Sequence, residues 1–329
     1  MRLERAAIAP LTCGACSTLG RMRRRTLILL AFVAIGGCDR SKGNKNAAGS
    51  SAAPNTAVAP SSNACNLAPL PLRRPQPERL VAIGDVHGDI AAARSALKAA
   101  GAIDGSDNWI GGKLVVVQTG DVLDRGDDEQ AILDLFFALE PKAKAAGGEF
   151  IFLNGNHELM NAAGDFRYVT PGSRNAFGDR VAALKPGGDY AKKLAQHDVV
   201  TIVGDTVFAH AGPVGPFATQ LEEVNMSSRC WLDGQGGSGY EPPIAMTSED
   251  SPVWTRAYGM ETADCDAAKA AMTAIGVKRI VVGHTVQKQI NSVCDGAVWR
   301  IDVGLAKLYD GPIEVLEVYP TPRVIQGTR

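Results

Sequence analysis

The chain has 329 residues, of which 45% are hydrophobic, and its formal net charge is −1. Residues 1–38 contribute six arginines and one glutamate, so residues 39–329 carry a formal charge of −6. Because this remainder has no basic stripe and no interleaving of basic and aromatic residues, the sequence argues against nucleic acid as the partner.

The N-terminal region has the pattern of a secretory signal. A basic segment at 21–25 precedes a short apolar run at 26–35, too short for an ordinary transmembrane span. The segment 35–38 resembles a bacterial lipobox, in which Cys38 is lipidated and becomes the mature N-terminus. We therefore expect a periplasmic-side protein of the cell envelope, held at the membrane by its N-terminal lipid, and Asp39 favours the inner membrane. An uncleaved anchor or a non-lipidated signal are the alternatives.

This interpretation divides the chain into three parts. Residues 1–38 are the predicted signal peptide, and because 1–20 precede the basic segment, translation starting at Met22 is an alternative. Residues 39–77 are rich in Ala, Ser, Asn, Gly and Pro without apolar periodicity, which predicts a flexible linker. Residues 78–329 are long enough for one large domain with its own core.

Strand-like and helix-like segments alternate within this domain. Apolar runs typical of buried strands lie at 79–83, 113–117, 150–153, 206–209 and 279–283. Helices are predicted at 91–100 and from 128 to about 139, the second ending near Pro141. The alternation predicts an α/β domain of packed sheets with helices outside. The weaker patterns at 159–198 and 213–278 are interpreted as helical and loop insertions that shape a substrate cleft.

Three of the predicted strands end in the same kind of loop, which combines glycine with Asp, Asn or His and leads into a helix. These loops lie at 84–88, 120–126 and 154–158. One Gly-Asp pair usually marks only a turn. Three such loops at strand ends predict a shared ligand site, because open α/β sheets bind ligands there. In the second loop, Asp121 can bridge two metal ions and Arg125 can hold a phosphate by two hydrogen bonds.

The histidines strengthen this hypothesis. Four of the five follow an apolar run and adjoin a glycine or an Asp/Asn motif at a strand end: His87, His157, His210 and His284. A lone histidine is more often a satisfied core or surface residue. Only His197 lacks the strand-end context.

These loops and histidines together resemble the calcineurin-like metallophosphoesterase superfamily. The endings Asp124, Arg125, Gly126 and His157, Glu158 resemble its phosphoprotein phosphatase branch. The greatest similarity is to the bacterial Shewanella-like protein phosphatases, through segments 153–161, 164–169, 251–254, 282–287 and 298–304. The resemblance covers roughly 78–318 and implies an αββα sandwich of two mixed sheets flanked by helices.

The resemblance also implies a dinuclear centre that binds two divalent ions, manganese, iron or zinc. The implied ligands are Asp85, His87, Asp121, Asn156, His210 and His284. His157 is the implied general acid, oriented and kept cationic by Asp124, and the implied phosphate-binding residues are Arg125, Arg256 and Asn156. A water that bridges the two ions would attack phosphorus directly.

The implied activity is that of a phosphomonoesterase, in particular a protein phosphatase acting on phosphotyrosine or on phosphoserine and phosphothreonine. Many phosphodiesterases of this superfamily have Gly-His-x-His where this chain has Val286, which cannot coordinate a metal, and this favours monoesters. A symmetrical diadenosine tetraphosphate hydrolase is the alternative enzyme. A non-catalytic envelope lipoprotein is the alternative of another class. A small phosphomonoester remains an alternative substrate to a phosphorylated protein.

Four cysteines remain after the predicted signal: Cys65, Cys230, Cys265 and Cys294. Three pairings are open to them in an oxidising compartment. The first candidate pair is Cys265 with Cys294, which flank the strand before His284. Buried free thiols are the alternative.

Overall fold

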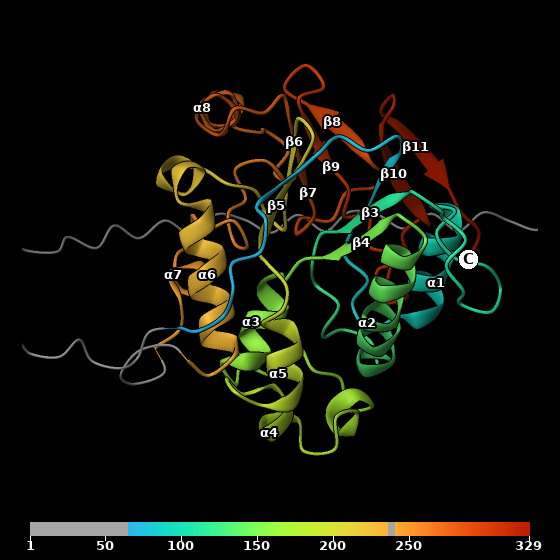
Figure 1. Cartoon of the computed structure of the whole chain (residues 1–329), viewed down its shortest axis with the longest axis vertical. Helices are drawn as coiled ribbons and strands as arrows, with labels where there is room; N and C mark the ends of the chain where they lie inside the picture. The colour runs from blue at the N-terminus through green and yellow to red at the C-terminus, as the bar shows by residue number, and fades with distance from the viewer. Residues whose placement is uncertain (1–64, 236–240) are drawn as a thin grey trace, which may run out of the picture. The chain divides into compact units, whose positions relative to one another are not determined.

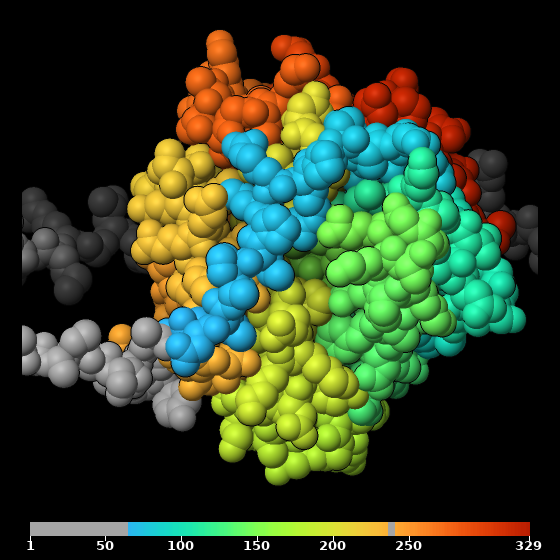
Figure 2. All heavy atoms as spheres, viewed as in Figure 1, coloured from blue at the N-terminus to red at the C-terminus, as the bar shows by residue number. Residues whose placement is uncertain are grey.

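The computed structural model describes residues 65–235 and 241–329 (Figure 1; Figure 2 shows the same view with all atoms as spheres). The predicted signal peptide 1–38, with its lipidation site Cys38, and residues 39–64 of the predicted linker lie outside this part. Among the described residues, the helices are all too short or too polar to cross a membrane.

Six strands form the first sheet, in the order β1-β5-β6-β7-β9-β8. Their bounds are β1 Arg73–Arg74, β5 Val200–Val203, β6 Thr206–Ala209, β7 Arg279–Val282, β8 Asn291–Val293 and β9 Val298–Arg300. Strands β6, β7 and β9 are mutually parallel neighbours, so their carboxyl ends lie at one edge of the sheet.

Five strands form the second sheet, in the order β11-β10-β2-β3-β4. Their bounds are β2 Leu80–Ile83, β3 Val115–Gln118, β4 Glu149–Phe152, β10 Glu314–Tyr319 and β11 Arg323–Gln326. Strands β2, β3 and β4 are parallel and apolar, as expected for strands covered on both faces. All five strands predicted from the sequence are confirmed within one or two residues.

Helices cover both sheets (Figure 1). Their bounds are α1 Ile90–Ala99, α2 Glu129–Ala145, α3 Asn156–Ala162, α4 Arg180–Leu184, α5 Asp189–Leu194, α6 Leu221–Leu232, α7 Ile244–Thr247 and α8 Cys265–Ile275, with short 3₁₀ turns at η1 Ser173–Asn175 and η2 Gly215–Thr219. Helix α1 contacts β10 and α2 contacts β4 of the second sheet, and α8 contacts β7 of the first. The predicted α/β architecture with two mixed sheets is confirmed.

Helix α2 is longer than predicted, because it continues through Pro141 to Ala145. Proline removes one helical N–H. The helix continues because Ala143 after the proline is buried in the core, while Lys142 and Lys144 complement the negative end of the helix dipole.

The last thirteen residues of the predicted linker are part of the fold. Strand β1 pairs in parallel with β5, and Cys65 forms a disulfide with Cys230 of α6. The boundary predicted at residue 77 therefore lies too late. Strand β1 has only two residues, both arginine, so it leaves no apolar pattern that sequence analysis can detect.

The predicted disulfide between Cys265 and Cys294 is confirmed, and it closes a loop of 29 residues. Such a cross-link restricts the unfolded chain, so a variant with both cysteines changed to alanine should lose about 3–4 kcal/mol in free energy of unfolding. Urea denaturation of the two proteins measures the difference. An unchanged midpoint and slope would contradict a stabilising role for this bond.

Candidate metal centre and active site

The site is built where the carboxyl ends of parallel strands from both sheets meet. Backbone N–H groups of His87 and Gly88 donate to the carbonyl oxygens of Asp121 and Val122, at 3.0 and 2.8 Å. The loop after β3 also touches the loop after β4, since a Cβ added to Gly120 would lie 2.5 Å from a backbone nitrogen of the neighbouring loop. Glycine is therefore required there for the loops to approach.

Glu158, which is fully buried, holds the loop 120–126 in place through hydrogen bonds to its backbone. Its carboxylate accepts hydrogen bonds from the backbone N–H groups of Asp121, Val122 and Leu123, at 2.9, 2.8 and 3.0 Å. It also accepts one from Gly155, at 2.7 Å. A carboxylate with four donors is an ordered positioning group. Sequence analysis placed this residue in a motif without assigning it a role.

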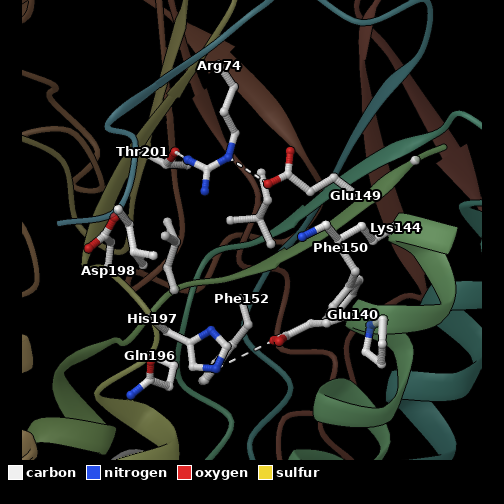
Figure 3. Close-up of a pocket in the computed structure, with 15 residues that line it drawn as sticks. Arg74, Glu140, Lys144, Glu149, Phe150, Phe152, Gln196, His197, Asp198 and Thr201 are labelled. Carbon is white, nitrogen blue, oxygen red and sulfur yellow. Dashed lines mark hydrogen bonds and ion pairs between the residues drawn. The ribbon is translucent and has the colours of Figure 1, made fainter. Parts of the chain in front are cut away.

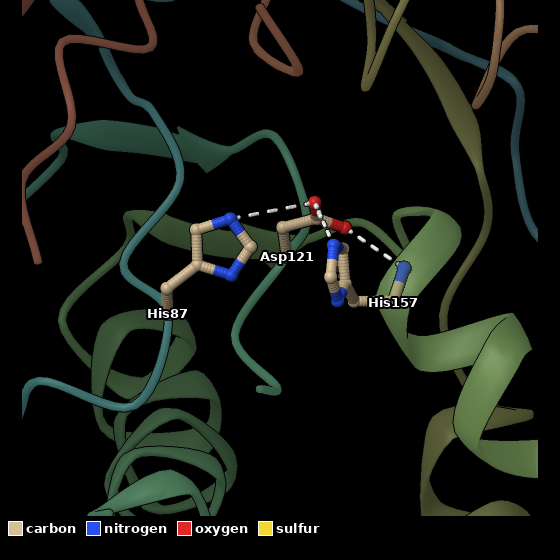
Figure 4. Close-up of side chains that lie close together, drawn as sticks. All are labelled: His87, Asp121 and His157. Carbon is tan, nitrogen blue, oxygen red and sulfur yellow. Dashed lines mark hydrogen bonds and ion pairs between the residues drawn. The ribbon is translucent and has the colours of Figure 1, made fainter. Parts of the chain in front are cut away.

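The Asp121 carboxylate lies between the rings of His87 and His157 (Figure 4). Its Oδ2 is 3.1 Å from Nε2 of His210, 3.7 Å from Nε2 of His87 and 3.8 Å from Nε2 of His157. Its Oδ1 accepts from the backbone of His157 at 3.0 Å. Among the described residues, two groups can each hold a metal ion: His87, Asp121 and His157, and Asp121, His210 and His284. Asp121 is common to both, as a bridging ligand requires.

The imidazoles are oriented to offer a lone pair. Nδ1 of His87 lies 3.0 Å from the carbonyl oxygen of Leu123, and Nδ1 of His210 lies 3.0 Å from that of Thr119. When each Nδ1 donates to its carbonyl, Nε2 is left free to bind a metal. Burial lowers the pKa of His87 to about 4, which keeps its ring neutral, as ligation requires.

Two further predicted ligands carry buried atoms without a partner. Oδ1 of Asn156 and Nε2 of His284 have no hydrogen-bond partner among residues 65–235 and 241–329. Buried polar atoms are normally paired, so the Asn156 oxygen fits an absent cation. In His284 the nitrogen that faces the cluster is Nδ1, which lies 3.0 Å from Nε2 of His210. Burial lowers the pKa of His284 to about 3, so this ring is neutral as well.

Asp85 completes the predicted set, and beside it lies Asp302, which sequence analysis did not assign. Burial raises the pKa of Asp85 well above its ordinary value, and the carboxylates of Asp302 and Asp121 raise it further. Burial also raises the pKa of Asp302 to about 6. Buried carboxylates that repel one another are stabilised when divalent cations neutralise them. The residues present therefore fit a pair of divalent ions.

The backbone is strained at this site. His87, Asp121, Asp124, Arg125 and His284 all have positive φ, between 39° and 71°. Non-glycine residues rarely adopt such angles, and strain of this kind is concentrated at functional sites.

His157 lies beside the metal centre and is held by Asp124. Its Nδ1 is 2.5 Å from Oδ2 of Asp124, which is fully buried. Burial alone would lower the pKa of His157, but the carboxylates of Asp121 and Asp124 outweigh it and raise the pKa. A protonated imidazole cannot ligate a metal but can donate a proton. The geometry therefore favours an acid over a third metal ligand at this position.

A buried network supports Asp124, and sequence analysis missed it. Arg180 of α4 donates to Oε1 of Glu129 at 2.9 Å and to Oδ1 of Asn161 at 2.7 Å. Asn161 in turn donates to Oδ1 of Asp124 at 3.1 Å and to the carbonyl of His157 at 2.9 Å. Glu129 also accepts from the backbone N–H of Asp124. The weakly patterned insertion thus supplies the cation of this network.

Arg125 is presented at the mouth of the site by aromatic rings. Its guanidinium carbon lies 4.2 Å from the centroid of Tyr168 and 5.8 Å from that of Tyr309. Among the described residues no carboxylate lies within ion-pair distance of it, and its Nε has no hydrogen-bond partner. The guanidinium is thus available to an anion. Arg256 is exposed nearby and donates to Thr285 at 3.1 Å, next to His284.

Comparison with known proteins agrees with this geometry. The sequence matches the calcineurin-like phosphoesterase family over residues 78–288. Shewanella-like protein phosphatase 2 of Arabidopsis thaliana is 40% identical over 302 residues, covering 76% of this chain and 77% of the relative. Shewanella-like protein phosphatase 1 of Plasmodium berghei is 30% identical, covering 69% and 67%.

Among solved structures, a cold-active protein-tyrosine phosphatase of a psychrophilic Shewanella species matches with a TM-score of 0.67 and 25% identity, covering 78% of this chain and 83% of that one. The fold and the site thus define a metallophosphoesterase. The chain belongs to the calcineurin-like phosphoesterase family and, within it, to the Shewanella-like protein phosphatases.

Proposed function

We propose that this protein hydrolyses phosphomonoesters on protein side chains, with phosphotyrosine as the preferred substrate. The observation that carries the proposal is the unpaired Arg125 guanidinium beside the carboxylate and histidine cluster, with an Asp124-bound histidine at its edge. This arrangement combines an anion site, a metal site and an acid. The curated relatives named as protein phosphatases support it.

We assign the metal ligands as Asp85, His87, Asp121, Asn156, His210 and His284. When bound, two divalent ions supply positive charge for the phosphate oxygens and lower the pKa of water towards neutrality. Their mixed oxygen and nitrogen donors suit manganese, iron or zinc.

The remaining steps belong to side chains of this chain. Arg125 binds the phosphate oxygens and stabilises the charge that develops on them. Arg256, at the rim, is the second candidate cation for the same phosphate. His157 protonates the leaving oxygen, and Asp124 keeps that imidazole protonated and correctly turned.

Two features favour phosphotyrosine. Tyr168 is 37% exposed and its ring lies 5.1 Å from that of His157, so an aromatic wall stands beside the proposed leaving oxygen. Such a wall packs well against a phenyl ring. The similar Shewanella structure is itself described as a protein-tyrosine phosphatase.

The substrate preference is testable with matched esters. p-Nitrophenyl phosphate should be hydrolysed at least tenfold faster than bis-p-nitrophenyl phosphate, because the diester carries less negative charge for Arg125. A phosphotyrosine peptide should be hydrolysed faster than the same peptide with phosphoserine in place of phosphotyrosine. Faster diester hydrolysis would overturn the site assignment, and a preference for diadenosine tetraphosphate would make the protein a dinucleotide hydrolase.

For the location of the protein, we propose lipidation at Cys38 and anchoring on the periplasmic side of the inner membrane. The basic and apolar segments before Cys38 support this proposal, as do the disulfides Cys65–Cys230 and Cys265–Cys294, which form in oxidising compartments.

Changing Cys38 to alanine should leave an unprocessed precursor or release the protein from membranes, since lipid attachment needs that thiol. Membrane fractionation and mass spectrometry of the N-terminus give the readout. The matched control is Cys13→Ala, which lies upstream of the predicted cleavage and should change nothing. Recovery of the unlipidated wild-type chain in the periplasmic fraction would rule out this anchor.

A further inference from the structure

A second cavity lies along strand β4, apart from the metal centre. It has a volume of about 620 Å³ and is bounded by β4, the last turns of α2, the segment 196–198, and Arg74 and Thr201 (Figure 3). None of the assigned metal ligands or catalytic residues lines it. Strand β4 is an edge strand of its sheet, so nothing from the sheet fills this space.

Part of the charge that lines this cavity is already neutralised. Arg74 pairs with Glu149 at 2.8 Å and donates to Oγ1 of Thr201 at 2.5 Å. Lys144 belongs to the exposed surface of α2 and extends to the rim. Among the described residues that line the cavity, these groups leave no free cation in its depth.

Two side chains that face each other line one end of the cavity: His197, which is buried, and Glu140, whose side chain is 33% exposed. Oε1 of Glu140 is buried and has no hydrogen-bond partner in the described part of the chain. The facing atom is Nε2 of His197, 3.5 Å away, and Figure 3 shows the two side chains pointing towards each other. His197 is 8% exposed, and its ring makes no hydrogen bond among the residues described.

The protonation of this pair defines what it can accept. Burial raises the pKa of Glu140 to about 7 and lowers that of His197 to about 3. His197 is therefore a neutral ring with a lone pair, and Glu140 is a carboxylate that burial destabilises. The adjacent Asp198 already has a cation, because its Oδ1 lies 3.9 Å from Nε of the buried Arg229. A donor cation therefore satisfies Glu140 and His197 together.

The walls around this pair are apolar. The ring of His197 stacks on Phe137 at 5.5 Å and lies 5.0 Å from Phe152. Phe150 and Pro141 also line the cavity. Carbon chains bind favourably to such a surface, and cations bind favourably to aromatic faces.

We propose that this cavity is a binding site for an ammonium or guanidinium group on an alkyl chain. The cation donates hydrogen bonds to Glu140 and His197, and its carbon chain lies on Phe150 and Phe152. A free alkylamine or guanidine and a lysine or arginine side chain of a partner protein share this chemistry.

Ligand binding in this cavity should change the environment of the loop that carries His157, the proposed acid. The Asn154 side chain donates to the carbonyl oxygens of His197 and Leu194, at 2.8 and 3.0 Å, and its backbone N–H donates to that of Asp198 at 2.9 Å. Asn154 is followed directly by Gly155, Asn156 and His157. The amide NMR signals of Asn154 and Gly155 should therefore shift as the cavity fills.

The test is a calorimetric titration of the full chain, without added divalent metal, with n-butylammonium, agmatine and a capped Ala-Ala-Arg-Ala-Ala peptide. We expect saturable binding of the cations and at least tenfold weaker binding of n-butanol. Glu140→Gln keeps the shape of the side chain and should weaken binding roughly 10- to 100-fold, the value of a charge-assisted hydrogen bond. Tighter binding of the peptide would assign the site to a partner protein, and tighter binding of agmatine to a free guanidine.

The matched control is Glu222→Gln, an exposed glutamate at the start of α6, which should leave affinity unchanged. A second variant, Glu140→Lys, places an ammonium inside the cavity and should abolish binding of all three cations. Thermal unfolding of each variant verifies that it is folded. No saturable binding, equal affinity for n-butanol, or unchanged affinity in Glu140→Gln would overturn the proposal. Phosphatase activity is not part of the readout, so the result is independent of the proposed function.

Discussion

Changing His157 to asparagine is expected to lower the turnover of phosphomonoesters by about 10²–10⁴ while metal content stays unchanged. Asparagine retains an N–H for Asp124, but it cannot transfer a proton. The imidazole is held 2.5 Å from Asp124 and its pKa is raised, both of which fit an acid. Turnover is measured together with metal per chain by plasma mass spectrometry.

The leaving group provides the sharper test. Phenyl phosphate needs a proton in the transition state more than p-nitrophenyl phosphate does, so the loss in His157→Asn should be larger for phenyl phosphate. Asp121→Asn is the comparison variant, because Asp121 belongs to both candidate metal groups and its change should lose metal as well as activity. Full activity of His157→Asn on phenyl phosphate would refute the assigned role.

The positions of these residues could be predicted because each follows its own strand directly. Asp85, Asp121 and Asn156 lie within a few residues of β2, β3 and β4, and parallel strands bring their carboxyl ends together. The sequence pattern alone therefore places them near one another. Glu158 stands in the same strand-end loop as Asn156, but its role could not be predicted, since the backbone N–H groups that it accepts from lie 36 and 37 residues earlier.

The fold, like the site, could be predicted only where the local sequence pattern is strong. Strands β2 and β3 were evident as apolar runs, whereas β10 was not predicted, and its Glu314 and Glu317 are buried through specific partners. Helix α2 passes through Pro141 because tertiary burial outweighs one missing hydrogen bond. The local sequence pattern therefore predicts neither strand β10 nor the continuation of α2 beyond Pro141.

Arg180 is the clearest residue that sequence analysis could not assign. It lies in a segment without strong periodicity, and its partner Glu129 is 51 positions earlier. Only the tertiary structure places the two together. Their proximity makes Arg180 a positioning residue for Asp124, whose Oδ1 lies 3.5 Å from Nη2 of Arg180.

Changing Arg180 to methionine is expected to lower the free energy of unfolding by about 3–5 kcal/mol. The change leaves Glu129, which is fully buried, without its cation. Urea denaturation monitored by circular dichroism gives the value. Arg167→Met is the matched control, because the Arg167–Asp165 pair is a surface pair with 66% of the arginine side chain exposed. That control should change stability by less than about 1 kcal/mol.

The double variant Arg180→Met with Glu129→Gln separates pairing from packing. It removes both charges, so its loss of stability should be smaller than the sum of the two single losses. If Arg180 acts through Asp124 on the general acid, Arg180→Met should also slow phenyl phosphate more than p-nitrophenyl phosphate, measured at a temperature where the variant stays folded. An equal loss on both substrates would mean that Arg180 serves stability alone. Additive losses in the double variant would mean that it does not pair with Glu129 in solution.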